Sequence, residues 1–386
     1  MNESQKEEFE ITPPGREKVH TEVAAPRLAE ELPKPPESFP EGEVAGQQLA
    51  EEMVANGYHV VIIFGSTSSG KTLLLASLLA YMKTQPEAEA EIRLGEPFNV
   101  TVSKYGEWSH SQAEAFFNKS LQEFIRGTAH AATRVHSPFF IPVVVKPRGN
   151  APAAKIAFLE SNGEWYAPNP DSNTFFPELR GEIAGIFTSY SRGISFLHLA
   201  PVTQVEVRTH GTETRKGTDE ELQQRADLAL IGCFEAYKSV RVAKHKDRHL
   251  LLVTKWDAHA VPGDSNSDGG DVFVEPDLKL VNDVARKKYP QAYTAFKNLS
   301  LETAPAHAKQ IMQYCSGVVS GRRVKRTDDE IDHMLQRYPR TLWNWIYRNA
   351  TERELYPKPE PQAATLGQRI NSLVHKFLNF IGAGSP

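Results

Sequence analysis

The sequence predicts a three-layer α/β fold, with a mostly parallel sheet of about six strands, one of them an antiparallel edge, and helices on both faces. Two observations carry this prediction. An apolar run of strand length, residues 59–64, passes through a glycine-bounded loop into a helix-forming run, residues 73–80. Further short apolar runs then alternate with longer segments of helical periodicity. At 386 residues, the chain is long enough for one large domain with accessory parts.

The expected strands and helices alternate along the chain. Strands are expected at residues 59–64, 138–145, 155–159, 193–201, 249–253 and 310–315. Helices are expected at residues 43–56, 73–84, 111–125, around 175–190, 218–242, 340–349 and 366–381. The domain plan is a flexible arm rich in proline and charge at 1–45, the main domain at 46–325 with a helical insertion at about 85–135, packing helices at 326–356, and a linker with an amphipathic C-terminal helix at 357–386.

Composition narrows the function classes. The net charge of −4 gives no basis for nucleic-acid binding, which normally shows as a basic domain or stripe. No early apolar segment resembles a signal peptide, and no apolar run is long enough to cross a bilayer, so a cytoplasmic location is expected. The two cysteines, Cys233 and Cys315, lie far apart in apolar contexts, which predicts buried free thiols in a reducing compartment.

The loop after the first strand has the composition of a phosphate-binding loop. Its eight residues are Gly65, Ser66, Thr67, Ser68, Ser69, Gly70, Lys71 and Thr72. The two glycines allow a tight turn, so that backbone N–H groups and the positive end of the following helix surround a phosphate. Lys71 is expected to reach the terminal phosphates, and Thr72 to place its hydroxyl on Mg²⁺. A plain Gly/Ser-rich turn, the alternative, does not account for the full pattern in its strand-to-helix context.

A second motif comes after the strand at 249–253. The strand runs into Thr254, Lys255, Trp256 and Asp257. In GTPases a strand that ends in Asn/Thr-Lys-x-Asp recognises guanine: the carboxylate accepts hydrogen bonds from the N1–H and the 2-amino group, and the lysine stem covers the base. The alternative is an ordinary strand end with two solvated charges.

On these two motifs the chain resembles a P-loop GTPase of the translation-factor class, the broad class that includes the small Ras-like GTPases. It is most similar to the larger, divergent bacterial GTPases with long insertions around the switches. The resemblance spans residues 57 to about 320 and implies GTP and Mg²⁺ as cofactors, with slow hydrolysis used as a conformational switch.

The resemblance also assigns roles around the strand at 155–159. Its terminal acid, Glu160, would reach the Mg²⁺ shell, and the N–H of Gly163 would sense the terminal phosphate. Glu160 stands where the family has Asp, which is a departure from the pattern. Glu164 occupies the position where many relatives carry a Gln that orients the attacking water. Residues 164–192 would correspond to a second switch and its helix.

Two further assignments are weaker by sequence. Thr133, just before the strand at 138–145, is the candidate for a switch-type Mg²⁺ contact, although Thr101 and Thr128 compete and an ordinary surface threonine is the alternative. Ser316, with Gly317 after it, resembles the short turn whose backbone N–H touches the guanine oxygen. Gly replaces the usual Ala there.

Residues 264–275 satisfy the spacing of a calcium loop, with Asp264 first and Glu275 last. Pro276 pushes Glu275 toward an extended conformation, and the helices that should flank such a loop are not predicted, so an acidic surface loop is favoured. Information about a protein partner is expected in the insertion at 85–135 and in the C-terminal helix. That helix docks on its own domain, binds a partner or meets a membrane surface, and the sequence gives no support for the membrane over the others.

Two other functions remain open from the sequence. The chain could be a P-loop ATPase with Glu160 as catalytic base, but Leu159 stands where such enzymes keep a Mg²⁺-binding Asp. It could also be a nucleotide-binding scaffold that has lost hydrolysis, which the Glu160 departure favours.

Overall fold

A computed structural model describes residues 40–66, 69–98, 110–125, 139–160, 181–202, 219–256, 278–299, 309–316, 318–319, 322–323 and 328–356. The chain divides into two units, Met1–Glu37 and Ser38–Pro386, and all described residues lie in the second unit. Most of the proposed arm, residues 1–39, lies outside the described residues, as do the linker and C-terminal helix at 357–386 and the loop at 264–275.

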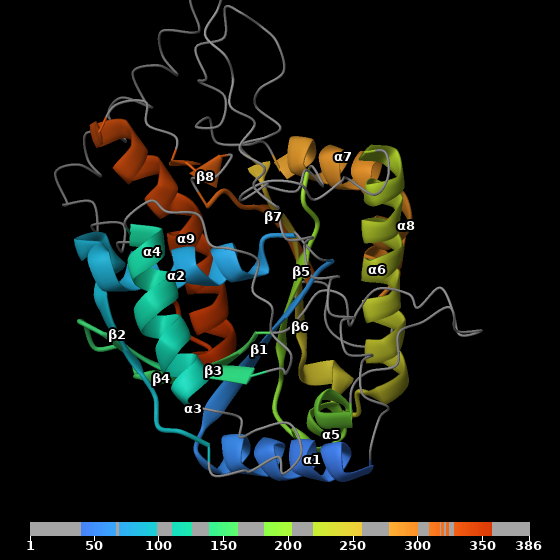
Figure 1. Cartoon of the computed structure of the whole chain (residues 1–386), viewed down its shortest axis with the longest axis horizontal. Coiled ribbons are helices and arrows are strands. Elements are labelled where there is room, and N and C mark those ends of the chain that lie inside the picture. Colours follow the sequence, from blue (N-terminus) through green and yellow to red (C-terminus); the bar gives the residue numbers. More distant parts are fainter. Residues whose placement is uncertain are drawn as a thin grey trace, which may run out of the picture. The chain divides into compact units, whose positions relative to one another are not determined.

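The described part of the chain contains one large sheet of seven strands in the order β2-β3-β4-β1-β5-β6-β7 (Figure 1). Its strands are β1 (Tyr58–Phe64), β2 (Ala90–Leu94), β3 (Phe139–Pro147), β4 (Ala154–Glu160), β5 (Ser195–Leu199), β6 (Arg248–Val253) and β7 (Lys309–Gln313). The five strands from β4 to β7 in this order pair in parallel, whereas β2 and β3 pair antiparallel, as do β3 and β4. The prediction of a mostly parallel α/β sheet is confirmed.

The sheet has one strand more than the expected number of about six, and the prediction of an antiparallel edge strand at β3 is wrong. The sheet has seven strands, and the antiparallel strand β3 is not its edge, because β2 pairs with its outer side from Ala90–Pro147 to Leu94–Val143. Residues 90–94 were expected within a helical insertion. They form a strand because alternate side chains, those of Ala90, Ile92 and Leu94, turn away from solvent while Glu91 and Arg93 are exposed, a period of two.

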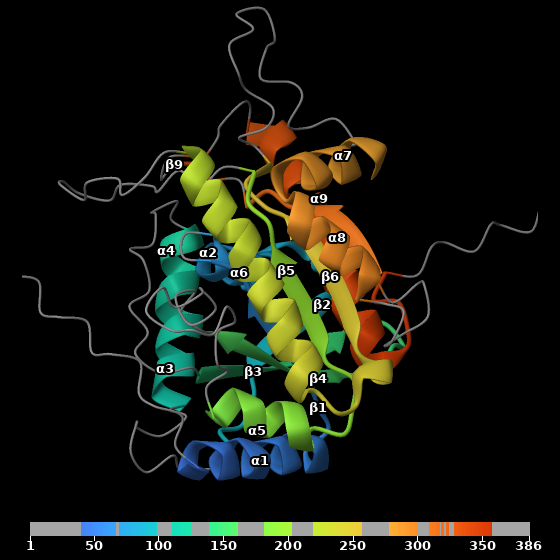
Figure 2. The same cartoon turned by 90° about the vertical axis from the view of Figure 1, so that its right-hand side faces the viewer.

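Helices cover both faces of the sheet, as predicted. On one face lie α2 (Lys71–Thr84) and α9 (Asp328–Thr351): Nε1 of Trp343 donates to the carbonyl oxygen of Leu78 at 2.8 Å, and its ring meets Phe158 of β4 edge-on at 5.7 Å. The other face carries α5 (Gly181–Ser189), α6 (Asp219–Val240) and α8 (Pro290–Asn298). There His198 of β5 contacts the rings of Phe234 and Phe296. Figure 2 shows α6 running along β5 and β6.

The remaining described elements differ from the expected pattern in detail. They are α1 (Pro40–Ala55), the single-turn 3₁₀ helices Pro86–Ala88 and Lys244–Lys246, α3 (His110–Ala115), the π-helical turn Phe116–Ser120, α4 (Leu121–Ile125), α7 (Leu278–Lys288) and the hairpin β8 (Val318–Val319) with β9 (Arg322–Arg323). The predicted helix at 111–125 is therefore present but interrupted by one π turn. Helices α7 and α8 were not predicted, and α9 extends the expected 340–349 helix by about four turns, mostly at its N-terminal end.

Helix α1 belongs to the same body as the sheet, so the domain boundary predicted at residue 46 falls inside a helix. Its backbone touches that of α5: a Cβ added at Gly46 would lie 2.1 Å from the carbonyl oxygen of Glu182. Both figures show α1 and α5 side by side. Cys233 and Cys315 are buried free cysteines, as predicted. Within the described residues, no helix is long and apolar enough to span a membrane.

Candidate functional site

The glycine-bounded loop begins where β1 ends, at the centre of the sheet between β4 and β5. Because all three strands are parallel, their carboxyl ends meet at this one edge, the place where α/β sheets bind ligands. Gly70 has φ 92°, in the left-handed region that favours glycine. A Cβ at Gly65 would lie 2.5 Å from Oγ of Ser69, so the chain turns back closely on itself.

Lys71 is the first residue of α2 and is buried, with 7% of its surface exposed. Its Nζ donates to the carbonyl oxygens of Gly65 at 2.9 Å and of Ser66 at 3.0 Å, which holds the ammonium group over the loop. The backbone N–H of Ser69 also donates to the carbonyl oxygen of Ser66, at 3.2 Å. The charge of Lys71 thus lies at the N-terminus of a 14-residue helix, where the first N–H groups have no partner within the helix, and this arrangement suits a phosphate.

Thr72 and Glu160 meet beside this lysine. The Thr72 hydroxyl donates to Oε1 of Glu160 at 2.8 Å, and Glu160 is the last residue of β4, which pairs with β1. Glu160 is 1% exposed. Burial raises its pKa to about 7, against the hydrogen bond from Thr72 and the charge of Lys71, which lower it. Among the described residues, no hydrogen-bond partner is found for the other oxygen, Oε2.

These two side chains suit a magnesium ion. Mg²⁺ takes oxygen ligands and is usually held by one or two protein groups, with phosphate oxygens and waters completing its shell. The Thr72 hydroxyl and the Glu160 carboxyl supply two such oxygens, and the buried Oε2 would gain a partner from a bound cation. No group of three or more His, Cys, Asp or Glu side chains with metal-site spacing occurs in the part of the chain that is described. The protein alone would therefore not complete the shell.

The second motif lies next to the loop. Oγ1 of Thr254, directly after β6, donates to the carbonyl oxygen of Ser69 at 3.0 Å. Lys255 has φ 53°, a left-handed conformation that is uncommon for a residue with a side chain and occurs at turns and functional sites. The N–H of Trp256 donates to the carbonyl oxygen of Tyr314, which brings the end of β6 beside Ser316 after β7. The structure thus brings together three segments that lie far apart in the sequence.

The other predicted site residues lie outside the described residues. They are Thr67, Ser68, Thr133, Gly163, Glu164 and Asp257. Their proposed roles stay predictions. The described site consists of Gly65, Ser66, Ser69, Gly70, Lys71, Thr72, Glu160, Thr254, Lys255 and Ser316.

One contact near the site was missed by the sequence interpretation. The hydroxyls of Ser77, in α2, and Tyr314, two residues before Ser316, are 2.5 Å apart and buried. This hydrogen bond ties the helix that starts at Lys71 to the end of β7. The Ser77 hydroxyl also donates to the carbonyl oxygen of Leu74 in its own helix at 2.7 Å, so its sequence context gave no signal for a distant partner.

Comparisons with known proteins give no family. No family model matches the chain, and no curated protein matches it. Among solved structures, it is similar to a dimerization-deficient mutant of Toc33 from Arabidopsis thaliana, with 10% identity, coverage of 82% of this chain and 98% of that one, and a TM-score of 0.32. It is also similar to the signal recognition particle receptor SRb-GTP/SRX complex from Chaetomium thermophilum, with 13% identity, coverage of 76% and 99%, and a TM-score of 0.29. Both scores are low, so the architecture rests on the strand order and the contacts of the sheet itself.

Proposed function

We propose that the protein binds GTP with Mg²⁺ and hydrolyses it slowly, as a conformational switch. The observation that carries the proposal is the meeting of Thr72 and Glu160 beside Lys71, at the edge where β1, β4 and β5 end. A loop hydroxyl, a carboxylate from the neighbouring strand and a buried ammonium group are the groups needed to hold a nucleotide triphosphate and its metal.

The chain's own residues would act together on the nucleotide. The loop amides and Lys71 bind the phosphates and fix their position, and the charge of Lys71 stabilises negative charge on them. Thr72 and Glu160 would hold the Mg²⁺ ion, which when bound neutralises charge on the phosphate oxygens. The hydrogen bond between these two residues orients both oxygens before the ligand arrives.

Selectivity for guanine would come from Asp257. Its carboxylate accepts two hydrogen bonds from guanine, whereas adenine presents an acceptor and a misplaced donor. The hydrogen bond from Thr254 to the carbonyl of Ser69 supports this assignment, because it ties the segment leading to Asp257 directly to the phosphate loop. Base and phosphates would then be held at a fixed separation.

We expect hydrolysis to be slow because of the carboxylates of Glu160 and Glu164. Glu160 is one methylene longer than the Asp of the family pattern, and Glu164 would add negative charge near the terminal phosphate. Faster turnover would then need a protein partner that supplies an arginine, a contribution worth about 10³–10⁵ in rate. The insertion at 85–135 and the C-terminal helix are the proposed contacts for such a partner, and the cytoplasm is the proposed location.

A nucleotide-binding scaffold without hydrolysis is the second candidate. Glu160 in place of the family's Asp favours it, because the longer carboxyl, already bonded to the Thr72 hydroxyl, would have to displace a metal-bound water or leave the metal shell. The ATPase alternative loses support, because the Glu160 carboxyl already accepts the Thr72 hydroxyl and thus faces the metal position rather than an attacking water. Leu159, at the position where such enzymes keep a Mg²⁺-binding Asp, is an apolar side chain and is fully buried.

The first experiment is nucleotide identification: the purified protein is denatured and the released nucleotide is analysed. Competition titrations with GTP, ATP and xanthosine triphosphate then test the base site. We expect GTP to be preferred over ATP by about tenfold or more, since an unsatisfied buried carboxylate costs at least about 1–3 kcal/mol. Equal affinity for ATP would reject guanine selectivity, and no binding of either nucleotide would reject the proposed function.

A substitution at Asp257 tests whether this residue recognises the guanine base. Asp257→Asn replaces one acceptor by a donor, so GTP affinity should fall while affinity for xanthosine triphosphate, which carries a 2-oxo group in place of the 2-amino group, should rise. Asp283→Asn is the matched control, because Asp283 is half-exposed on α7 and pairs with Arg286. Unchanged selectivity in Asp257→Asn would place the base elsewhere.

A further inference from the structure

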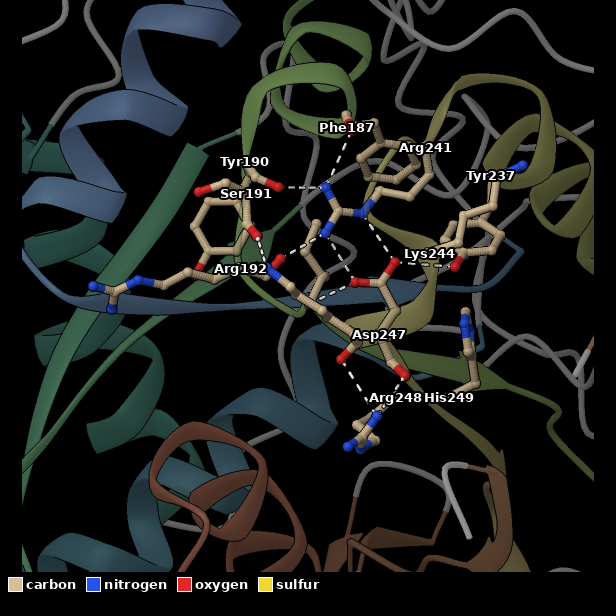
Figure 3. A network of polar contacts seen from close by, with 12 residues as sticks. Phe187, Tyr190, Ser191, Arg192, Tyr237, Arg241, Lys244, Asp247, Arg248 and His249 are labelled. Atoms are coloured by element: carbon tan, nitrogen blue, oxygen red, sulfur yellow. Dashed lines mark hydrogen bonds and ion pairs between the residues drawn. The ribbon is translucent and has the colours of Figure 1, made fainter. Parts of the chain in front are cut away.

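Two loops at the amino ends of β5 and β6 form a cationic surface at the opposite edge of the sheet from the phosphate loop. They are residues 190–194 and 241–247, and they lie opposite because β5 and β6 run parallel to each other, with β5 parallel to β1. The cations of this surface are Arg192, Lys244 and Lys246 of the loops and Arg248, the first residue of β6 (Figure 3 labels all but Lys246). Among the described residues, none of the four has a carboxylate within ion-pair distance.

A buried ion pair holds both loops in place. The Arg241 side chain makes two hydrogen bonds of 2.9 Å to the Asp247 carboxylate, and both side chains are fully buried (Figure 3). Arg241 also donates to the carbonyl oxygens of Tyr190 at 2.5 Å and Arg192 at 2.6 Å. Asp247 accepts from the N–H of Ile194 at 2.8 Å. The loops are therefore joined to each other by side chain to backbone contacts on both sides.

This arrangement separates the buried carboxylate of the loops from their outward-facing cations. Asp247 is the one acidic residue within 238–248, and it is turned inward. The surface lysines and arginines bind backbone carbonyls instead: Lys244 donates to Lys238, Lys246 donates to Ser191 at 3.0 Å, and Arg248 to Asp247 at 3.2 Å. Carbonyl oxygens hold these side chains in position but do not cancel their charge.

The negative ends of the neighbouring helices do not offset the charge of all four cations. Helices α5 and α6 both end at these loops, and each helix C-terminus carries about −0.5 elementary charge. Two helix ends thus offset about one of the four cations. The two loops and Arg248 thus keep more positive charge than the helix ends offset, on a chain whose net charge is −4.

An exposed aliphatic side chain stands in the same loop as two of these cations. Val242, between Arg241 and Lys244, is 71% exposed, the highest value among the exposed large hydrophobic residues of the described chain. We name Arg192, Val242, Lys244, Lys246 and Arg248 the basic platform. An exposed aliphatic group in a lysine-bearing loop suits the boundary between headgroups and acyl chains of a bilayer.

We propose that the basic platform binds the surface of an anionic lipid bilayer. Positive charge and an exposed aliphatic side chain together fit an anionic bilayer, which attracts the cations and takes up the apolar group at the boundary between headgroups and acyl chains. In this orientation the phosphate loop, at the opposite edge of the sheet, faces away from the lipid and stays accessible to nucleotide. The proposal does not depend on which nucleotide the protein binds.

The test is co-sedimentation of the full chain with phosphatidylcholine vesicles that contain or lack phosphatidylserine. Each lysine near an anionic surface contributes about fivefold to partitioning. Lys244→Glu with Lys246→Glu should therefore lower binding to the anionic vesicles by about 25-fold or more. The matched control is Lys287→Glu with Lys288→Glu, which makes the same charge change on exposed positions of α7. It should bind as the unmodified protein does.

Two further measurements keep the outcome clear. Val242→Ser should weaken anionic-vesicle binding without changing its salt dependence, and thermal unfolding should show that each variant is folded. The proposal is overturned if the unmodified protein does not bind anionic vesicles, or if the Lys244/Lys246 variant binds as well as the control, which would assign binding to another part of the chain. Tighter binding to RNA or to an acidic peptide than to vesicles would also overturn it. Nucleotide affinity should be equal in all these variants.

Discussion

The hydroxyl of Thr72 donates a 2.8 Å hydrogen bond to the carboxyl of Glu160, 88 residues away in the chain. This contact joins the helix that follows the phosphate loop to the end of the neighbouring strand. It also places a longer acidic side chain where the resemblance implies an Asp. The behaviour of this pair decides between a slow hydrolase and a scaffold.

Shortening Glu160 tests its role directly. In Glu160→Asp we expect GTP binding to be intact and the hydrolysis rate to be maintained or raised, because the shorter carboxylate withdraws by one methylene and leaves room for a metal-bound water. The measurement is single-turnover phosphate release with Mg²⁺. Glu235→Asp, in the surface pair with Lys238, is the control. Brisk turnover by the unmodified protein that is lost in Glu160→Asp would instead identify Glu160 as a catalytic base.

Removing the ammonium group of Lys71 should abolish nucleotide binding without unfolding the chain. Lys71→Ala loses charge-assisted hydrogen bonds to the phosphates, each worth about 1.5–3 kcal/mol, so affinity should fall by about 100-fold or more. Lys83→Ala, in the last turn of the same helix, should bind normally. Fluorescent-nucleotide titration and circular dichroism give the two readouts. A Lys71→Ala protein that binds with native affinity would show that the site lies elsewhere.

Acid should destabilise the fold through His59. Its ring is buried and its Nε2 lies 2.8 Å from Oγ of Ser195. Burial, and then the charges of Arg192 and Arg248, lower its pKa from 6.5 to about 4. The folded state therefore binds fewer protons than the unfolded state between these two pH values. The contribution of His59 to the free energy of unfolding is fully present above pH 6.5 and is lost as the pH drops toward 4. The expected loss is roughly 3 kcal/mol.

A variant isolates this contribution. Glu160, whose pKa is raised to about 7, changes stability in the opposite sense over the same range, so a single pH curve mixes the two. The free energy of unfolding of His59→Gln and of the unmodified protein is therefore measured with denaturant from pH 7 to pH 4.5. The contribution of Glu160 is common to both proteins and cancels in the difference. We expect a smaller acid loss in His59→Gln, and an unchanged loss in His245→Gln, at an exposed position. Equal curves for His59→Gln and the unmodified protein would contradict the prediction.

The buried ion pair beneath the basic platform should be essential for stability. Arg241→Ala leaves the Asp247 carboxylate buried without its cation, which costs about 3–5 kcal/mol. Arg286→Ala breaks an exposed pair with Asp283 and should change stability by less than about 1 kcal/mol. Urea unfolding measures both. Similar small losses in the two variants would mean that water reaches Asp247 in solution.

Local patterns predicted the elements that carry the site. Residues 65–72 have the spacing of a phosphate loop, and the apolar run before Thr254 has the length of a buried strand. Both were placed correctly because glycine spacing and apolar periodicity act within a few residues. The sequence also predicted the mostly parallel sheet, since strands alternating with helices favour it.

Long-range pairing was not predictable in the same way. Strand β2 was hidden in a stretch expected to be helical, because five residues of alternating burial become a strand only when β3 offers a free edge. Helices α7 and α8 were missed, and an Asp227 carboxylate from α6 accepts the N–H of Ala292 in the first turn of α8. Such a cap comes from another element and cannot be read from the local sequence, although Pro290 at the first position of α8 was a local start signal that the prediction did not use.

The sequence by itself determined the phosphate loop, the strand that leads into it and the acidic residue at the end of β4. Only the tertiary structure decided that Glu160 meets Thr72, that Thr254 meets Ser69, and that Asp247 is buried against Arg241 while the neighbouring cations face outward. The physical reason is that spacing and periodicity are properties of adjacent residues. Burial and hydrogen-bond partners depend on which distant segments the sheet brings together, and those set the charge state and the chemistry of each side chain.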